Sequence, residues 1–202
     1  SDSSSLQGSI IYGHDSNPFK LWLPDANQGA TKYKTLRLKY QGKSSLGDKA
    51  KGKKANLLYR LKLDKRSYNR SSSAADSFRL DGQLRWIERF KLSERKANLL
   101  LSANIRSERN TYYSQTQRQI AETSDGDLIG NRFSFDSADI TAELVYYAGQ
   151  KQSLSLLTSV AQRSYSEDYS AVGLESLDFN EFKLQPSFRY KADSGANLRL
   201  FI

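Results

Sequence analysis

The sequence predicts an all-β fold, a transmembrane antiparallel up-and-down β-barrel in which successive strands form a meander. Three observations predict it. Apolar residues alternate with polar ones over stretches of roughly ten residues, short and long connections occur between these stretches, and no apolar run approaches the length of a membrane helix. Because side chains of a strand point alternately to its two faces, each stretch has one apolar and one polar face.

The clearest alternation runs over 77–92, where even positions are nearly all apolar and odd positions nearly all polar. Further strands are expected at 31–40, 55–66, 98–109, 134–148, 153–165 and 178–192, with a stub at 197–202. Residues 31–202 are therefore expected to form the barrel. Residues 1–30 are expected to be an N-terminal segment that supplies a first strand from 7–13 and 19–23, or a periplasmic or plug piece.

The connections follow the plan of outer-membrane barrels, in which short turns are periplasmic and long loops extracellular. Short polar connections are expected at 93–97, 149–152 and 193–197, and longer ones at 67–76, 110–132 and 167–177. The Lys/Gly-rich segment 41–54 departs from this plan and is expected to be a long, mobile turn.

The stub at 197–202 is too short to cross a bilayer, which takes about 9–11 residues of strand. Bacterial single-chain barrels have even strand numbers. The barrel is therefore expected to be incomplete at its C-terminus, or else to close with strands from other chains. The chain begins at Ser1 and contains no methionine, so it is expected to be a mature or trimmed product.

Aromatic residues on the apolar faces are expected to contact lipid and to form two girdles. They are Tyr40, Phe78, Trp86, Phe90, Tyr146, Phe182, Phe188 and Tyr190. Two residues interrupt the pattern. Glu88 lies on an apolar face, which is expected near the periplasmic interface, where a charge costs far less than at midplane. Pro186 lies within a strand and is expected to cause a bulge or a locally open edge.

Composition excludes several classes of protein. The 202 residues include no cysteine, so disulfides, thiolate metal sites and a lipoprotein anchor are excluded. Mean hydropathy is −0.68, which a barrel tolerates because every second strand residue is polar. The net charge of +9 indicates an anionic partner, and the position of the charges decides which one.

The polar faces of the expected strands carry more bases than acids. The residues expected to line a pore are Arg37, Lys39, Arg60, Lys62, Arg79, Arg85, Arg89, Lys91, Arg106, Lys183, Arg189 and Lys191. A lumen lined in this way favours anions. The alternative is a ladder of cross-strand salt bridges that fills a narrow barrel, with surplus charge contacting lipid headgroups at the rim. The sequence does not decide between them.

No enzymatic, metal or cofactor site is expected. His14, the single histidine, is expected to be a solvated loop residue, and the adjacent carboxylates Glu167 and Asp168 point apart. No calcium-binding or phosphate-binding loop is present. Nucleic acid is not an expected partner, because the bases alternate with apolar residues instead of forming a stripe. Loop aromatics, including Tyr112, Tyr113, Tyr165 and Tyr169, are expected to pack at the rim rather than to bind sugars.

A weak internal repeat is visible. Residues 65–69 (KRSYN) precede a loop, a strand, a turn and the segment Ala-Asn-Leu at 97–99. Residues 162–166 (QRSYS) precede the same series and Ala-Asn-Leu at 196–198. The general similarity of barrel hairpins is the favoured explanation of this repeat.

Residues 31–202 resemble Gram-negative outer-membrane β-barrel proteins as a class, through generic motifs such as Ser187-Phe188-Arg189-Tyr190-Lys191 before a turn. In plan the chain is similar to anion-selective porins and exporters of acidic polysaccharide, and also to barrels that secrete polymers or surface proteins or that sheath haem proteins. The resemblance implies a location in the outer membrane. It carries over no functional residue, because fold does not fix function.

Three functions follow as hypotheses. The first is a pore or export conduit with a basic lumen that favours anionic solutes or polymers. The second is a scaffold barrel that encloses or docks partner proteins. The third is a soluble all-β binding protein, which requires a second layer over every apolar face.

Overall fold

The computed structural model describes residues 2–15, 31–46, 54–69, 75–111, 120–167, 169–192 and 195–201. In these residues nine strands form one antiparallel sheet, in which each strand pairs with the next along the chain. The strands are β1 (Ser3–Asp15), β2 (Thr31–Leu46), β3 (Lys54–Tyr68), β4 (Ser77–Leu92), β5 (Arg95–Arg109), β6 (Phe135–Tyr146), β7 (Gln152–Tyr165), β8 (Phe179–Lys191) and β9 (Asn197–Phe201). The expected all-β meander is confirmed, as one open sheet.

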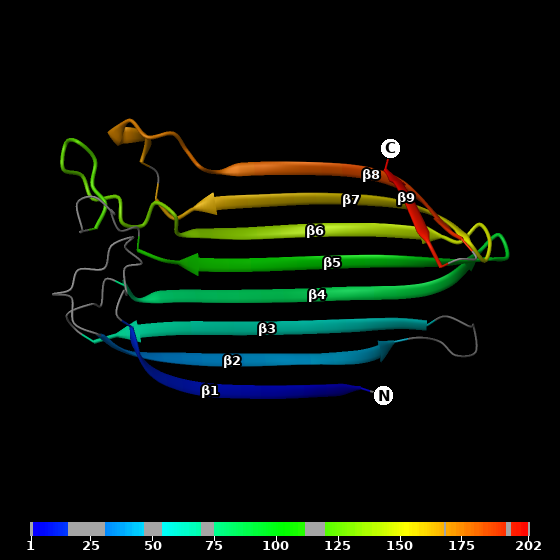
Figure 1. Ribbon diagram of the computed structural model, residues 1–202, viewed down its shortest axis with the longest axis horizontal. Helices are drawn as coiled ribbons and strands as arrows, with labels where there is room; N and C mark the ends of the chain where they lie inside the picture. Colours follow the sequence, from blue (N-terminus) through cyan, green and yellow to red (C-terminus); the bar gives the residue numbers. More distant parts are fainter. Residues whose placement is uncertain are drawn as a thin grey trace.

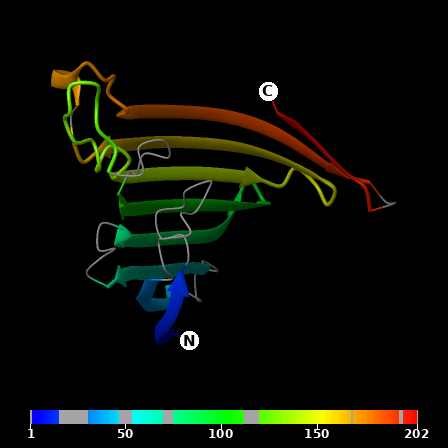
Figure 2. The same cartoon turned by 60° about the vertical axis from the view of Figure 1, so that its left-hand side comes forward.

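The short turns β4–β5, β6–β7 and β8–β9 gather at one end of the sheet, which is called the turn end below (Figure 1). The longer connections β3–β4, β5–β6 and β7–β8 lie at the opposite end, the loop end. A short 3-10 helix at Ser170–Val172 is part of the β7–β8 connection. Figure 2 shows that the sheet is curved and twisted, as antiparallel sheets with right-handed strand twist are.

Four sequence predictions about local structure need correction or completion. The predicted turn at 41–54 is wrong over 41–46, because β2 continues to Leu46 and pairs residue by residue with β3, and at Lys54, where β3 begins. Residues 47–53 lie outside the described residues. The N-terminal segment does supply a strand, β1, which is longer than predicted; residues 19–23 lie outside the described residues. His14 lies in β1 opposite Lys32 and not in a loop. The β7–β8 register runs through Pro186 without an inserted residue, so no bulge forms there.

On the other side of β8, the described part of β9 pairs with it from Ser187 to Lys191. The locally open edge expected at Pro186 stays a prediction. Proline has no N–H group to offer to a neighbouring strand, so a ladder that includes Pro186 lacks one donor at that residue.

Directly paired residues of neighbouring strands point to the same side of the sheet. The register therefore gathers the apolar side chains of all nine strands on one face and most polar side chains on the other. The level that contains Leu84 shows this best: it connects Tyr59, Leu84 and Ala103 and continues through Ile140 and Val160 to Phe182. We call this the apolar face and the other the polar face. Among the described residues, no second layer covers the apolar face: Ile140 is 65% exposed and Phe182 70%.

Burial confirms that the described residues form a single layer. Their buried apolar side chains are limited to Ala55, Ala97, Ala121 and Ile129. The chain exposes 13918 Å², whereas a compact monomer of its 22.9 kDa exposes about 9,600 Å². The apolar face accounts for this excess in part, and it needs a partner that takes it out of water.

The apolar band on this face ends obliquely to the strands at the loop end. On β2 the last apolar residue is Leu36 and the next residue on the same face is Lys34. On β5 the change is from Ile105 to Ser107, and on β8 it is from Phe182 to Asn180. Followed through the register, Leu36 is level with Phe78 and Phe182 is level with Leu84. The boundary thus shifts by the six residues from Phe78 to Leu84 while it crosses from β2 to β8.

This shift gives the angle between the strands and the band. Six residues of strand rise about 20 Å and six strand spacings measure about 29 Å. The ratio of these two lengths means that the strands are inclined by about 35° to the direction perpendicular to the band boundary. Strands of membrane barrels are tilted by about 35–45°.

Two glycines on the apolar face let neighbouring side chains lie flat on the sheet. Gly42 lies opposite Tyr59, and a Cβ at Gly42 clashes with the Tyr59 ring, which packs beside Tyr40 with 5.5 Å between ring centroids. Gly82 lies opposite Ile105 and its missing Cβ makes room for that side chain in the same way. Both glycines therefore serve close packing across strands.

Glu88 is the acid on the apolar face within the band, and it lies towards the turn end, two residues before Phe90. Its carboxylate accepts a hydrogen bond from the indole nitrogen of Trp86, at 3.4 Å. This hydrogen bond gives one carboxylate oxygen of Glu88 a donor, which reduces the free-energy cost of a charged side chain on an otherwise apolar surface.

The sequence repeat corresponds to two equivalent clamps at the loop end. In the first, the backbone N–H of Tyr68 donates to the Asp76 carboxylate at 2.7 Å, and the Tyr68 ring lies 5.8 Å from that of Tyr33 on the preceding strand. The guanidinium of Arg66 stacks over Tyr33 at 4.7 Å.

The second clamp lies four strands later and has the same parts. The N–H of Tyr165 donates to Asp178 at 2.6 Å, the Tyr165 ring lies 5.8 Å from Phe135, and Arg163 stacks over Phe135 at 4.5 Å. The unit β2–β3–β4 is thus repeated in β6–β7–β8. The two units share the same hydrogen bond, ring contact and cation–π contact at equivalent positions. The general similarity of barrel hairpins, which the sequence alone favoured, does not explain so many shared contacts.

Candidate functional site

The register brings the residues predicted to line a pore onto one surface. All twelve lie on the polar face, and all eight predicted girdle aromatics lie on the apolar face. The polar face is therefore the candidate functional site. Its charges are arranged differently at its two ends.

At the loop end, two aspartates each hold two bases. Asp81 accepts from Arg79 on its own strand at 2.8 Å and from Arg106 directly opposite on β5 at 2.7 Å. Asp64 likewise forms ion pairs with two bases, with Lys62 at 2.6 Å and with Arg37, opposite on β2, at 3.1 Å. One base is two residues away along the strand and the other is directly across it, so both point to the same side as the acid.

A line of polar contacts continues this network across the sheet. Gln83 donates to Asn104 at 2.9 Å, and Asn104 donates to Asp139 at 2.7 Å. These residues follow one another on β4, β5 and β6. The loop end of the polar face is therefore cross-linked by hydrogen bonds and ion pairs. Lys39 lies opposite Lys62 here, but Asp64 forms an ion pair with Lys62, so the charges of this end are largely balanced.

At the turn end the bases are not balanced. We call the basic residues of the polar face from the level of Arg85 to the level of Lys91 the basic band. It consists of Lys43, Lys54, Arg85, Arg89, Lys91, Lys96, Lys183, Arg189 and Arg199. Among the described strand residues, Glu143 is the acid on this part of the face.

Several members of the basic band face one another directly. Lys54 pairs with Arg89, Lys91 with Lys96, and Arg189 with Arg199. Like charges directly opposite in an antiparallel sheet are destabilising. The fold places three such pairs at one end of one face, so the turn end carries an excess of positive charge. A surface with such an excess favours anions.

A hollow of about 510 Å³ lies on the polar face within the turn end. Its lining includes Glu143, Lys151, Ser153, Ser155, Ser187, Arg189, Lys191 and Asn197. The hydroxyls of Ser155 and Ser187 lie 2.7 Å apart and share a hydrogen bond. Bases and hydroxyl groups together are the donors that bind phosphate and carboxylate groups.

Sequence reasoning missed four members of the basic band. Lys43 and Lys54 fell in the segment predicted to be a turn, Lys96 in the predicted connection 93–97, and Arg199 in the stub. Strand alternation continues through Lys43 and Ser45, and this signal could have extended β2. Which base lies opposite which follows only from the register.

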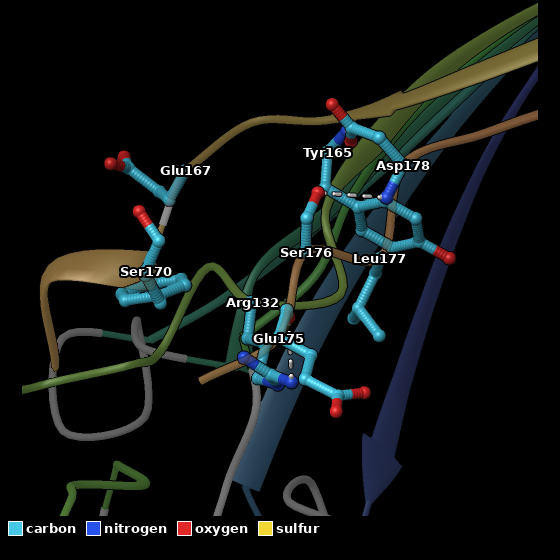
Figure 3. Close-up of a pocket in the computed structure, with 9 residues that line it drawn as sticks. Arg132, Tyr165, Glu167, Ser170, Glu175, Ser176, Leu177 and Asp178 are labelled. Atoms are coloured by element: carbon cyan, nitrogen blue, oxygen red, sulfur yellow. Dashed lines mark hydrogen bonds between the residues drawn. The ribbon is translucent and has the colours of Figure 1, made fainter. Parts of the chain in front are cut away.

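A second hollow, of about 210 Å³, lies among the loops of the loop end (Figure 3). Arg132 donates there to the backbone carbonyl of Glu175 at 3.4 Å. Burial raises the pKa of the Tyr169 phenol, although a hydrogen bond with the backbone of Asn131 lowers it in part. Tyr165 packs on Phe135, as expected of rim packing, and Tyr112 and Tyr113 lie outside the described residues.

The acids of this loop hollow do not converge on one point. Figure 3 shows the carboxylates of Glu167, Glu175 and Asp178 pointing in different directions, and Asp178 is engaged by the backbone of Tyr165. Within the described residues no group of three or more histidine, cysteine or acidic residues is close enough to hold a metal ion. In the same part of the chain, no helix has the length and apolar character needed to cross a membrane.

Comparisons with protein-family models, with curated proteins and with solved structures found no match for this chain.

Proposed function

We propose that this sheet is part of a β-barrel in the outer membrane of a Gram-negative bacterium. The observation that carries the proposal is the apolar band, which crosses β1 to β8, has no covering layer among the described residues and ends obliquely at about 35°. A soluble sandwich covers its apolar faces with a second sheet. A lipid bilayer covers such a band without one, and an inclined boundary is what tilted strands produce.

Charged residues bound this band at the loop end, where we place the extracellular lipid headgroups. Lys34, Lys65, Arg109 and Asp136 lie on the apolar face beyond or at its edge, and Arg109 forms an ion pair with Asp136 at 2.6 Å. Charges cost little at the interface and far more at midplane. The position of these four residues agrees with a bilayer that covers the apolar band from this edge to the turn end.

Strand number constrains how such a barrel closes. The strands alternate in direction, so β1 and β9 run in the same sense. Pairing them directly gives a parallel contact, whereas bacterial outer-membrane barrels are antiparallel with even strand numbers. A closed antiparallel barrel that includes this sheet therefore contains at least one strand besides these nine.

We further propose that the polar face lines a water-filled conduit that favours anionic solutes or polymers. The balanced network around Asp64 and Asp81 stiffens the wall at the loop end, and the basic band at the turn end sets the sign of the field. In the orientation with short turns in the periplasm, anions meet the basic band on the periplasmic side.

Single-channel recording in planar bilayers under a KCl gradient tests this function. We expect open channels with chloride preferred over potassium, and a several-fold loss of that preference in the triple variant Arg85→Gln, Arg89→Gln, Lys183→Gln. The variant Lys32→Gln, Lys34→Gln, Lys65→Gln removes equal charge from the opposite face and should change it little. A closed channel contradicts the conduit and favours a scaffold barrel that encloses or docks partner proteins.

A further inference from the structure

The turn-end row of the polar face carries four bases at one level. Lys91 and Lys96 are directly paired on β4 and β5, and Arg189 and Arg199 on β8 and β9. The register shows that the two pairs are level: Phe90, one residue before Lys91, connects through Ala97, Tyr146 and Leu154 to Phe188, one residue before Arg189. Both β4 and β8 run towards the turn end.

These bases lack acidic partners within the part of the chain that the structure describes. Lys91, Lys96 and Arg189 form no ion pair there, and Arg199 stacks on the ring of Phe201 at 4.6 Å instead. Each direct Lys–Lys or Arg–Arg pair lowers the stability of the sheet. A ligand that places negative charge between the members of each pair removes this cost.

The span of the row decides what kind of ligand can do so. Five strand spacings separate β4 from β9, which is about 24 Å. One phosphate or carboxylate group contacts bases only within about 3–4 Å. A small anion therefore neutralises one pair, whereas a chain with several anionic groups neutralises the row.

The residues between the two basic pairs suit such a chain. The hollow beside Arg189 is lined by Ser153, Ser155 and Ser187, which lie on β7 and β8 and offer hydroxyl groups on the polar face. Hydroxyls donate to anionic oxygens and also to sugar or ester oxygens of a polymer backbone. Glu143 is the acid in this lining, so we place the anionic groups on the basic pairs rather than beside it.

We propose that the turn-end row binds a linear polyanion laid across the strands, a polymer of phosphate or carboxylate groups. This inference rests on the proposed conduit and specifies its substrate class: a polymer engaged at the periplasmic mouth rather than a small free anion.

The test is calorimetric titration of the protein in zwitterionic detergent micelles. Linear polyphosphate and polygalacturonate are the polymeric probes, and orthophosphate and galacturonate are the matched monomers. We expect at least one polymer to bind at least tenfold more tightly per charged group than its monomer, with affinity that falls as salt rises. The polymer that binds more tightly identifies the group, phosphate or carboxylate.

The variant Lys91→Gln, Lys96→Gln, Arg189→Gln should lose at least tenfold in polymer affinity and show a shallower salt dependence. The variant Lys32→Gln, Lys34→Gln, Lys65→Gln, with the same change in charge on the other face, should bind as the parent does. Folding of both is checked by tryptophan fluorescence and by heat-dependent migration in gels.

Two results overturn the inference. One is equal affinity per charge for polymer and monomer; the other is equal loss of polymer binding in both triple variants, which indicates attraction to net charge alone. Either result with an anion-selective channel leaves the conduit standing. A channel that stays closed while the row binds polymer with the expected selectivity overturns the conduit and supports the polyanion site.

Discussion

The loop end and the turn end of the polar face use the same residue types in opposite ways. At the loop end, Asp64 and Asp81 each lie between two bases, so charges hold neighbouring strands together. At the turn end, Lys91 faces Lys96 and Arg189 faces Arg199. Balanced charges stabilise a wall, whereas unbalanced charges remain open to a ligand. We therefore propose that the loop end is a structural region and the turn end a recognition region of one continuous surface.

The difference between the two ends has this meaning only if the polar face meets water and the apolar face meets lipid. A single charge placed on each face in turn tests this. Ile140→Arg places an arginine in the apolar band, where it should cost about 2–4 kcal/mol in folding into a bilayer. Thr141→Arg, its neighbour on the polar face, should cost no more than about 0.5 kcal/mol. Urea titration of folding into phosphatidylcholine vesicles measures both. Equal costs would show that the two faces do not differ in environment.

The acids of the two ends should differ in their effect on stability. Asp81→Asn leaves two arginines without their shared carboxylate and should cost about 1–3 kcal/mol in the free energy of unfolding. Glu143→Gln, at the turn end, breaks no ion pair among the described residues and should change it by about 0.5 kcal/mol or less. Chemical unfolding in micelles measures this. A larger loss at Glu143 contradicts the division into a structural and a recognition end.

The two clamps should also stabilise the loop end, through hydrogen bonds and ring contacts rather than ion pairs. Asp76→Ala and Asp178→Ala each remove the acceptor of one tyrosine N–H, at 2.7 and 2.6 Å. Each should cost about 1 kcal/mol, and the two costs should add because the clamps are four strands apart. The same unfolding measurement on the single and double variants checks this. Unequal costs would show that the repeated clamps are not equivalent.

The smallest effect is expected from relief of like charges at the turn end. Lys91→Glu converts its pair with Lys96 into one of opposite charge and should stabilise the protein by about 0.2–1 kcal/mol. Lys91→Gln should give a smaller gain by the same measurement. A destabilising Lys91→Glu would mean that the like-charge pairs cost nothing, which removes the reason to expect a ligand there.

Strands and faces could be predicted from the sequence because alternation is a local signal. The strand predicted at 77–92 has the bounds Ser77–Leu92. The prediction was wrong at 41–46, where Gly42, Ser44 and Ser45 are typical turn residues and outweighed a weak alternation, although pairing with β3 holds them in β2. In β1 the small polar residues Ser3, Ser4 and Ser5 give a weak pattern, and the strand is defined by its partner β2.

The charge balance of the site could not be predicted, because it depends on register. The sequence shows that Arg37, Asp64 and Arg106 lie on polar faces. It does not show that Arg37 is opposite Asp64, or that Lys91 is opposite Lys96. The difference between the two ends of the polar face arises from these cross-strand neighbours.

Whether the apolar face meets lipid can be measured at Trp86, which lies on that face. Trp22→Phe leaves Trp86 as the single tryptophan of the chain. We expect strong quenching of its fluorescence in vesicles of brominated phosphatidylcholine and weak quenching by aqueous acrylamide. Moving the tryptophan one residue, to the polar face, with Trp86→Phe and Ile87→Trp, should reverse both. Strong acrylamide quenching of Trp86 with no effect of bromine would contradict a lipid-facing apolar surface, and with it the barrel.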